Sequence, residues 1–384
     1  MKLINYHEID YKKFHGGRRI WIALISLMSA ILVLGCTGVS VPEGWSSATV
    51  ADDIVYIGTM DGDFRALDLN SGEVQWIFSL RGEEKSRAVY GTPVVHEETI
   101  YFGGYDGILY ALSIDGDELW DRQLGDGLPI VGGPALTQDL VIIGSSDGNL
   151  YALNINDGSS VWKFSTGNRI WSTPVIADGV VYFGSLDQNV YAVTVDEGKE
   201  LWRFPAKGGV VGTPVIADGK LYIGSFASVF YSIDIKTGEL SWKFDEAKSW
   251  FWGGGIVNSD RVYAPSLDGR VYALDRRSGE LDWAVETEGS VIGAPVIVSD
   301  RLAIASTDGR VRVVDLIDGQ GERHCDIRND IRTSLVSSND FVLLSATDHS
   351  IRALKIKSSG NPDEEWVHFS NKDGSIESDW IRSC

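Results

Sequence analysis

The side chains that most often carry chemistry do not form a catalytic motif in this sequence. The segment GSSDG at residues 144–148 matches the nucleophile pattern G-x-S-x-G. That pattern needs a strand-to-helix turn to expose its serine, and this segment falls between two predicted strands. The four histidines beyond residue 35 lack metal-ligand spacing; they are His96, His324, His349 and His368. We therefore predict no catalytic residue, no metal site and no cofactor.

The first 35 residues differ in composition from the rest of the chain. Basic residues outnumber acidic ones up to Arg19, and residues 20–35 then carry no charge. A basic leader followed by an apolar run predicts an export signal. The run ends in VLGC, which resembles the lipobox of bacterial lipoproteins, so we expect either a lipidated Cys36 or an uncleaved signal anchor. Both alternatives place the rest of the chain outside the cytoplasm and hold it at a membrane, on the periplasmic face of an outer membrane or the outer face of the cytoplasmic membrane.

Two cysteines remain if Cys36 carries a lipid. Cys325 and Cys384 are an even pair in an oxidising compartment, which favours a disulfide that holds the C-terminal tail. The alternative is a buried Cys325 and a free Cys384 at a frayed end. The residues alone leave both open.

The net charge of the 384-residue chain is -20. Nucleic-acid affinity comes largely from lysine and arginine side chains that displace counterions from phosphates, so this acidity excludes a nucleic-acid partner. The hydrophobic content of 43% is enough for a packed core.

A repeat of about 40 residues organises the rest of the chain. Each copy has four short apolar segments separated by tight turns, and a turn position recurs eight times. In the fifth copy we expect the innermost strand over residues 210–217, VVGTPVIA. Strands that are apolar at nearly every position are covered on both faces. We therefore predict an all-β, eight-bladed β-propeller of four-stranded antiparallel blades over residues 45–369. The other parts are a signal peptide or anchor (1–35), a tether (36–44) and a C-terminal tail (370–384), and we expect the propeller to be monomeric.

A tryptophan stands at one equivalent position in the last strand of seven repeats, where a flat indole can pack between blades. We expect these residues to dock neighbouring blades; they are Trp76, Trp120, Trp162, Trp202, Trp242, Trp283 and Trp366. The seventh repeat has no tryptophan. Allowing for two extra residues in its turn, we place Cys325 at the tryptophan position.

The segments ALDLNSGEVQW and ALDRRSGELDW resemble the tryptophan-docking repeat of the PQQ-type propellers, also described as WD40-like. That family includes quinoprotein alcohol dehydrogenases and outer-membrane assembly lipoproteins of the BamB type. The resemblance implies the fold more than the function, because the motif residues are packing residues. The dehydrogenases also have two adjacent cysteines over their cofactor, which this chain lacks. PQQ with calcium therefore belongs only to the alternative of a PQQ-dependent oxidoreductase.

The residues just before each innermost strand differ between repeats and are often aromatic. The residues that we expect around the channel mouth are Trp45, Tyr90, Arg169, Trp171, Trp250, Trp252 and Arg332. Aromatic rings and a few cations at a channel mouth suit capture of an extended polypeptide or another protein's edge. The alternative is that these rings only wedge the blades apart or plug the channel.

The sequence thus favours a membrane-tethered, non-enzymatic propeller that binds another envelope protein. The BamB resemblance implies a role in outer-membrane β-barrel assembly or envelope protein quality control. Two other classes stay open: a quinoprotein dehydrogenase, and a propeller that binds a carbohydrate or another small ligand at the aromatic mouth.

Overall fold

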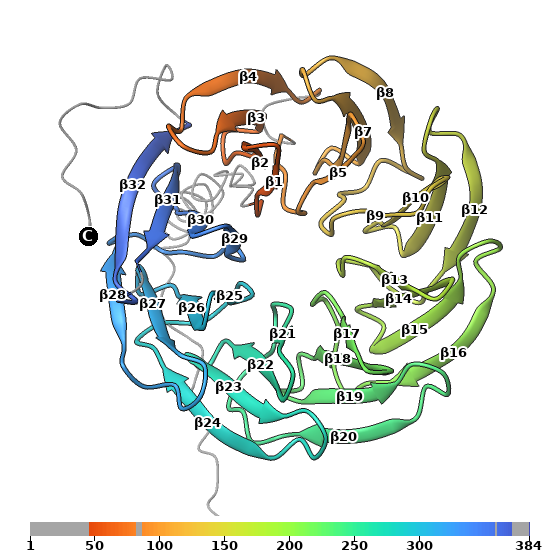
Figure 1. The fold of residues 1–384 in the computed structure, drawn as a ribbon. Coiled ribbons are helices and arrows are strands. Elements are labelled where there is room, and N and C mark those ends of the chain that lie inside the picture. The colour runs from red at the N-terminus through yellow and green to blue at the C-terminus, as the bar shows by residue number, and fades with distance from the viewer. Residues whose placement is uncertain (1–45, 82–86, 358, 371–383) are drawn as a thin grey trace, which may run out of the picture. The chain divides into compact units, whose positions relative to one another are not determined.

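A computed structural model describes residues 46–81, 87–357, 359–370 and 384. These residues form eight four-stranded antiparallel sheets arranged as the blades of a ring (Figure 1). The predicted eight-bladed propeller is confirmed. The predicted leader, Cys36 and Trp45 lie outside the described residues. Within the described part of the chain, no helix is long and apolar enough to cross a membrane.

Each blade contributes four strands in sequence order, from the innermost strand A to the outermost strand D (Figure 1). Blades 1 to 4 contain β1 (Thr49–Ala51), β2 (Ile54–Gly58), β3 (Asp63–Asp68), β4 (Val74–Ser79); β5 (Val94–His96), β6 (Thr99–Gly103), β7 (Ile108–Ser113), β8 (Glu118–Gln123); β9 (Ala135–Leu136), β10 (Leu140–Gly144), β11 (Asn149–Asn154), β12 (Ser160–Ser165); β13 (Val175–Ala177), β14 (Val180–Gly184), β15 (Asn189–Thr194), β16 (Glu200–Pro205). Blades 5 to 8 contain β17 (Val215–Ala217), β18 (Lys220–Gly224), β19 (Phe230–Asp234), β20 (Leu240–Phe244); β21 (Ile256–Val257), β22 (Arg261–Ser266), β23 (Arg270–Asp275), β24 (Leu281–Glu286); β25 (Val296–Val298), β26 (Arg301–Ala305), β27 (Arg310–Asp315), β28 (Arg323–Asp326); β29 (Val336–Ser338), β30 (Phe341–Ser345), β31 (Ser350–Ile356), β32 (Pro362–Phe369).

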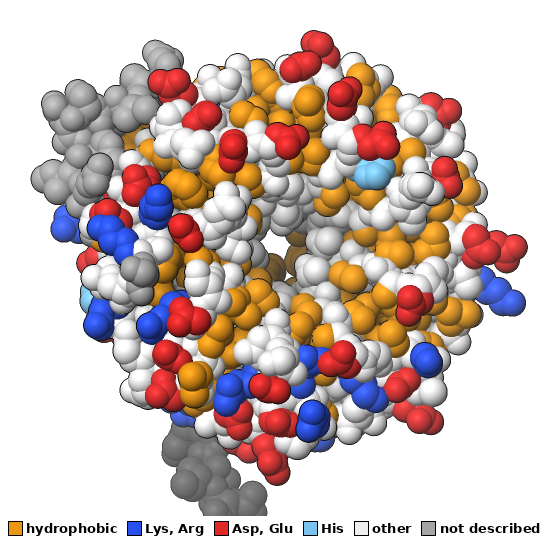
Figure 2. Space-filling view, in the orientation of Figure 1, with side chains coloured by type: hydrophobic (Ala, Val, Ile, Leu, Met, Phe, Trp, Pro, Cys, Tyr) orange, Lys and Arg blue, Asp and Glu red, His pale blue; other side chains and the backbone are white. Residues whose placement is uncertain are grey.

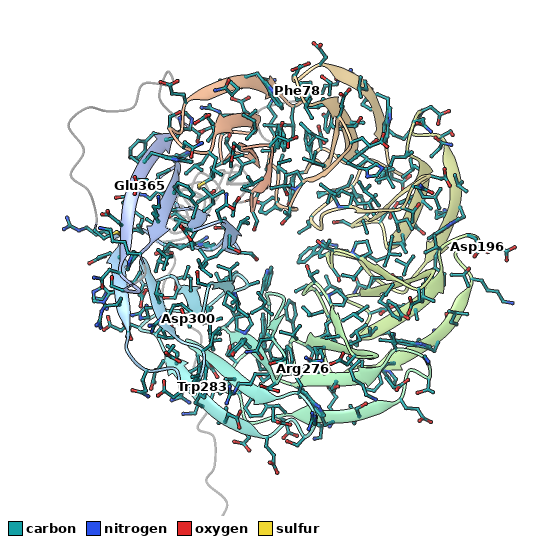
Figure 3. All side chains as sticks on the ribbon, viewed as in Figure 1. Phe78, Asp196, Arg276, Trp283, Asp300 and Glu365 are labelled. Atoms are coloured by element: carbon teal, nitrogen blue, oxygen red, sulfur yellow. A yellow bond between two sulfur atoms is a disulfide. The ribbon has the colours of Figure 1, made fainter. Side chains whose placement is uncertain are left out.

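The core lies between blades rather than within them. Strands B and C are buried along almost their whole length, as in β14 and β18. One apolar cluster joins Tyr182 and Val190 of blade 4 to Leu221 of blade 5, and side chains fill the spaces between the other blades in the same way (Figure 3). Because each sheet is covered on both faces, its strands are apolar at successive positions instead of alternating ones.

Each of the seven strand-D tryptophans connects its own blade to the next one. Each indole Nε1–H donates a hydrogen bond of 2.7–3.2 Å to a backbone carbonyl of the following blade. The donor and acceptor pairs are Trp76 and Ile114, Trp120 and Ile155, Trp162 and Val195, Trp202 and Ile235, Trp242 and Arg276, Trp283 and Ile317, Trp366 and Leu69. The last pair joins blade 8 to blade 1 and so closes the ring.

Each of these indoles also lies on the glycine of the next blade's C–D turn. Gly238 of blade 5 has φ +72°, and a Cβ added there would stand 2.7 Å from a ring carbon of Trp202. The turn therefore needs glycine for two reasons, a left-handed backbone and a close ring. In the same blade the turn glycine precedes the tryptophan by four residues, as in Gly238 and Trp242. The same short segment thus receives the indole of the preceding blade and supplies an indole to the following one.

The placement of Cys325 at the tryptophan position of blade 7 is wrong. In β27, Val313 is equivalent to the small strand-C residue that faces the tryptophan elsewhere, and its partner is Arg323. Cys325 pairs with Val311, the position that Phe244 occupies opposite Phe230 in blade 5. The error came from treating the DGQG turn as longer than the others, whereas Arg323 follows Gly319 by the usual four residues.

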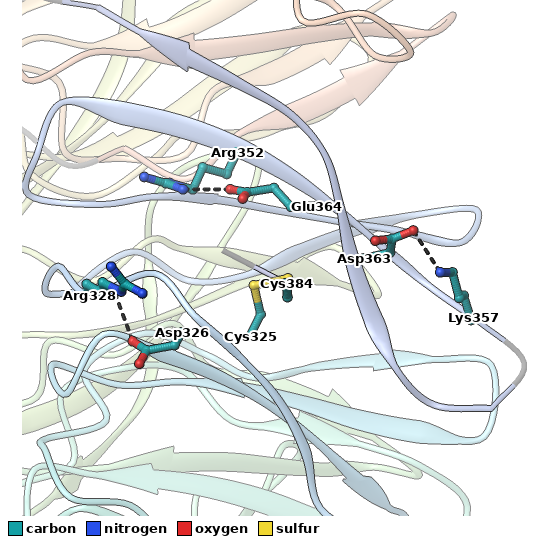
Figure 4. The surroundings of a disulfide bond; sticks show 8 residues. All are labelled: Cys325, Asp326, Arg328, Arg352, Lys357, Asp363, Glu364 and Cys384. Atoms are coloured by element: carbon teal, nitrogen blue, oxygen red, sulfur yellow. Dashed lines mark hydrogen bonds and ion pairs between the residues drawn. A yellow bond between two sulfur atoms is a disulfide. The ribbon is translucent and has the colours of Figure 1, made fainter. Parts of the chain in front are cut away.

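The seam between blades 7 and 8 lacks a docking indole and contains a disulfide. Cys325 of β28 is joined to Cys384, with 5.1 Å between their Cα atoms (Figure 4). Cys325 is fully buried in a cluster that contains Leu344 and Leu354 of blade 8. The linked residues are 59 apart in sequence, and a loop of this length restricts the unfolded chain by an entropy worth about 4 kcal/mol in the simplest model.

The seam between blades 8 and 1 contains a buried polar network. Arg65 of β3 donates from Nη1 to His368 Nε2 at 2.9 Å and from Nη2 to the Ser370 carbonyl at 2.7 Å. Ser370 also donates to Asp61 in the B–C turn of blade 1. An imidazole nitrogen that accepts from a guanidinium has to be unprotonated. Burial, and next the charge of Arg65, lower the pKa of His368 to about 4.

Substituting Gly238 by alanine is expected to destabilise the protein more than the same change at Gly219. Both glycines have nearly the same φ, +72° and +73°, but a Cβ at Gly219 meets nothing within 4 Å. The strained backbone costs about 1–2 kcal/mol in each variant, while collision with Trp202 adds about 1–3 kcal/mol in Gly238→Ala alone. Denaturant unfolding of the two variants measures the difference in their free energies of unfolding. Equal losses of stability would contradict a close contact between residue 238 and the Trp202 ring.

Acidification is expected to weaken the closing seam through His368. The unfolded histidine has a pKa of about 6.5, above its folded value, so between pH 6.5 and 4 the unfolded state binds the additional proton and stability falls as the pH drops. The loss reaches about 2 kcal/mol by pH 4.5. His368→Gln keeps an acceptor for Arg65 and removes the titration. Unfolding at pH 7 and pH 4.5 should therefore show a steeper loss in the wild type; parallel losses in both proteins would contradict this account.

Candidate functional site

A cavity of about 300 Å³ occupies the central channel at the end where the D–A loops enter. The space-filling view shows the channel as a hollow at the centre of the ring, seen from one face of the molecule (Figure 2). Seven of the residues that precede the innermost strands line this cavity: Tyr90, Val131, Trp171, Val211, Trp252, Ile292 and Arg332. Of the predicted mouth residues, Tyr90, Trp171, Trp252 and Arg332 are thus brought together.

Small residues let the loops converge on the channel axis. In blade 5 the segment Gly212–Pro214 precedes β17, which is shorter than the expected strand over residues 210–217. Pro214 has no backbone N–H to donate, which limits the strand to the residues after it. A Cβ at Gly212 would stand 2.9 Å from the Gly253 carbonyl of the next blade. Sequence reasoning missed this glycine ring, although the repeated G-T-P segment was its signal.

Hydroxyl groups also line the cavity, among them those of Thr173 and Ser334. Thr173 Oγ1 accepts from Gly133 N at 2.8 Å, and Ser334 Oγ accepts from Ala294 N at 3.0 Å. Each of these bonds links one blade to the next around the axis. The hydroxyls therefore stabilise the ring, and they also present polar groups to the cavity.

Four aromatic rings form a continuous row on one side of the mouth, over blades 4 to 6. Trp250 stacks on Phe226 with 4.7 Å between ring centroids, and Phe226 stacks on Trp252 at 5.3 Å. Trp252 contacts Trp171 at 6.4 Å, and the Arg169 guanidinium lies 5.8 Å from the Trp171 ring centroid. We call Trp250, Phe226, Trp252 and Trp171 the aromatic row.

The aromatic row is accessible to solvent. Trp250 is 45% exposed, and the other three rings are partly buried. A hydrogen bond also holds the Trp171 ring in place, since its Nε1–H donates to Ser146 Oγ at 2.9 Å. Arg169 and Trp250 thus belong to the same surface as Trp171 and Trp252, although they do not line the cavity itself. Stacking against neighbours fixes the rings in place without burying their outer faces.

The opposite side of the mouth is more polar. Arg332 pairs with Asp330 at 3.2 Å, and Tyr90 contacts Tyr105 with 5.3 Å between ring centroids. The mouth therefore has one apolar side and one side with charges and hydroxyls. An asymmetric rim of this kind favours a bound segment with a defined orientation.

Carboxylates in the B–C turns surround this end of the channel and hold the turns. Asp187 accepts from the Tyr191 hydroxyl at 2.7 Å and from the Asn189 backbone N–H at 3.1 Å. Burial, followed by the hydrogen bond and charge of Asp268, raises the pKa of Tyr272 to about 12 in the same arrangement in blade 6. In blade 7, burial alone would raise the pKa of Asp308, but hydrogen bonds from Arg312 and Ser306 lower it to about 2. These carboxylates are engaged in hydrogen bonds that hold the fold, and the low pKa of Asp308 makes that group poorly suited to acid–base catalysis at neutral pH.

Phe226 was missed by sequence reasoning. It lies in the B–C turn of blade 5, where the repeat reads Phe226-Ala227 in place of a residue followed by aspartate. That departure from the repeat is visible in the sequence, and it could have pointed to Phe226 as a functional residue. Among the described residues, no three His, Cys, Asp or Glu side chains form a group that could hold a metal ion. The arrangement at the mouth is suited to binding by stacking and burial.

Comparison with known proteins agrees with the geometry. The fold defines an eight-bladed propeller of the PQQ-like class. A family model described as outer membrane protein assembly factor BamB matches residues 38–127, 115–207, 165–251 and 229–322. These matches cover most of the chain, which therefore belongs to the BamB family.

Two solved structures share the fold. The crystal structure of BamB from Moraxella catarrhalis has a TM-score of 0.68 and 21% sequence identity, over 78% of this chain and 93% of that one. The computationally designed Ika8 protein has a TM-score of 0.72 and 20% identity, over 82% of this chain and 97% of that one. No curated protein matches the sequence. At these identities the structural likeness establishes the fold only.

Proposed function

We propose that this protein is a non-enzymatic scaffold that binds other envelope proteins at the mouth of its central channel. The observation that carries the proposal is the aromatic row, four rings in contact that remain accessible on the rim of an acidic propeller. Aromatic side chains are enriched at the centres of protein interfaces, because they offer a large apolar area with few rotatable bonds.

The repeat itself gives no structural reason for the aromatic row. Val211 holds the position equivalent to Trp171 and Trp252, and it completes its blade with a far smaller side chain. Trp250 aligns with Gly209 of the preceding loop. Blades therefore close without large rings at these positions, which supports docking over the alternative that the rings only wedge blades apart.

The cellular role that we propose is the one after which the family is described, assembly of outer-membrane proteins. Its support is the family match together with the leader at residues 1–35 and the lipobox-like end at Cys36, which favour export and attachment to a membrane. In this role the propeller is held outside the cytoplasm beside a membrane, and its channel mouth receives part of another envelope protein.

Chemical crosslinking of the full-length protein in its native membranes, followed by affinity capture and mass spectrometry, tests this role. The wild type is expected to recover a component of the β-barrel assembly machinery. Replacing Trp171 and Trp252 by alanine should reduce that recovery about tenfold or more, since loss of central interface aromatics costs about 2 kcal/mol or more.

The control variant is Leu119→Ala, which removes an exposed apolar side chain from strand D of blade 2, away from the channel (54% exposed). It should leave recovery unchanged. Equal recovery from the wild type and the double tryptophan variant would place the docking surface elsewhere, and recovery of no envelope protein at all would overturn the proposed function.

A further inference from the structure

The B–C turn of blade 5 breaks a pattern that holds in every other blade. Seven of the eight turns have an aspartate at one equivalent position: Asp61, Asp106, Asp147, Asp187, Asp268, Asp308 and Asp348. Blade 5 has Ala227 there. In blades 2, 3, 4 and 6 this carboxylate accepts a tyrosine hydroxyl at 2.5–2.7 Å. The aspartate is therefore a structural group that blade 5 lacks.

Losing the carboxylate removes local hydrogen bonds without replacing them. Tyr231 stands where those tyrosines stand, but its hydroxyl accepts from Lys207 N at 3.0 Å and has no carboxylate to donate to. Ser228 also keeps a left-handed backbone, with φ +61°, where five of the other turns have glycine. Each lost hydrogen bond is worth about 1 kcal/mol. Stability of the blade therefore does not explain Ala227.

The same turn lies in the middle of the accessible aromatic surface. Phe226, the residue before Ala227, is the ring that stacks on both Trp250 and Trp252. Gly208 and Gly209 of the neighbouring loop pack against this turn, since a Cβ at Gly208 would stand 2.6 Å from Ala227 N. An aspartate at residue 227 would bring a negative charge to the edge of the aromatic row.

Three cations belong to the loops around the aromatic row. Arg169, Lys207 and Lys248 are exposed and form no ion pair with any described residue. Other cations on this end of the propeller are paired, such as the partly buried Arg310 with Glu288 and Arg270 with Glu286. Most of the carboxylates close to them in the chain are engaged: Asp187 and Asp268 accept backbone N–H groups at Gly167 and Lys248, and Asp245 pairs with Lys243. Glu246, two residues before Lys248, is exposed, and the charge of Lys207 helps to lower the pKa of Asp245.

We propose that this part of the mouth binds an extended acidic segment of the partner protein. One large apolar or aromatic side chain of the segment stacks on Phe226 and Trp250, and carboxylates on either side of it face Lys207, Lys248 and Arg169. The argument is charge complementarity: in a chain of net charge -20, the absent aspartate and the three unpaired cations coincide with the accessible rings. An acidic segment is repelled by most of this surface and attracted here. The inference rests on the proposed function and specifies which segment it takes.

Peptide binding to the full-length protein tests the inference. The probes are three ten-residue peptides with blocked ends: one has four aspartates around two phenylalanines, one replaces the aspartates by lysine, and one replaces the phenylalanines by alanine. Calorimetric titration should detect binding of the first peptide, weaker at high salt, and little binding of the other two. Ala227→Asp should weaken binding of the first peptide at least fivefold. This variant restores the residue that seven turns already have, so it is expected to fold.

Asn156→Asp is the matched control. It adds the same single charge at an exposed residue of a C–D turn, at the other end of the propeller. It should leave the affinity within twofold of the wild type. Equal affinity for the aspartate and lysine peptides, or an Ala227→Asp variant that binds as well as the wild type, would overturn the inference.

The two proposals fail in different ways. If no acidic peptide binds while Trp171→Ala and Trp252→Ala still lose the crosslinked partner, the acidic-segment inference is wrong and the scaffold function stands. If the acidic peptide binds as expected but no envelope protein is captured from native membranes, the charge preference of the site is supported and the proposed function is wrong.

Discussion

The contact between a strand-D indole and the C–D turn of the next blade is the interaction on which the ring depends. It combines a hydrogen bond to a backbone carbonyl with packing on a glycine that has no Cβ. Every blade but the seventh supplies an indole, and the C–D turns of blades 1 to 7 each receive one on a glycine. The same contact therefore recurs around the ring and fixes the angle between sheets. Where Arg323 replaces the indole, the Cys325–Cys384 disulfide lies at the seam.

The repeat gave the fold reliably because its residues are the packing residues. The 40-residue period and the turn glycines predicted the eight four-stranded blades. Strand A was overestimated, since residues before Pro214 follow the channel instead of pairing. Cys325 was misplaced because the turn of blade 7 was taken to have two extra residues, whereas the register is set by pairing of Val313 with Arg323.

The candidate site was only partly predictable. Trp171 and Trp252 were found because they occupy equivalent positions in the repeat. Phe226 was missed because it comes from a different turn, and its stacking between Trp250 and Trp252 depends on the angle between blades 5 and 6. The buried network of Arg65 and His368 joins residues 303 apart in sequence, and no local pattern reveals such a pair. Departures from the repeat, once aligned on the structure, are therefore the best guide to function in this fold.

The most direct test of the central claim is photocrosslinking from the mouth itself in native membranes. A photoreactive phenylalanine analogue replaces Trp250 in one variant and Leu119 in another, both of them exposed positions. The account predicts a discrete protein adduct from position 250 and none from position 119. Adducts from position 119 alone, or from neither position, would contradict the claim that the aromatic row is where this propeller meets its partner.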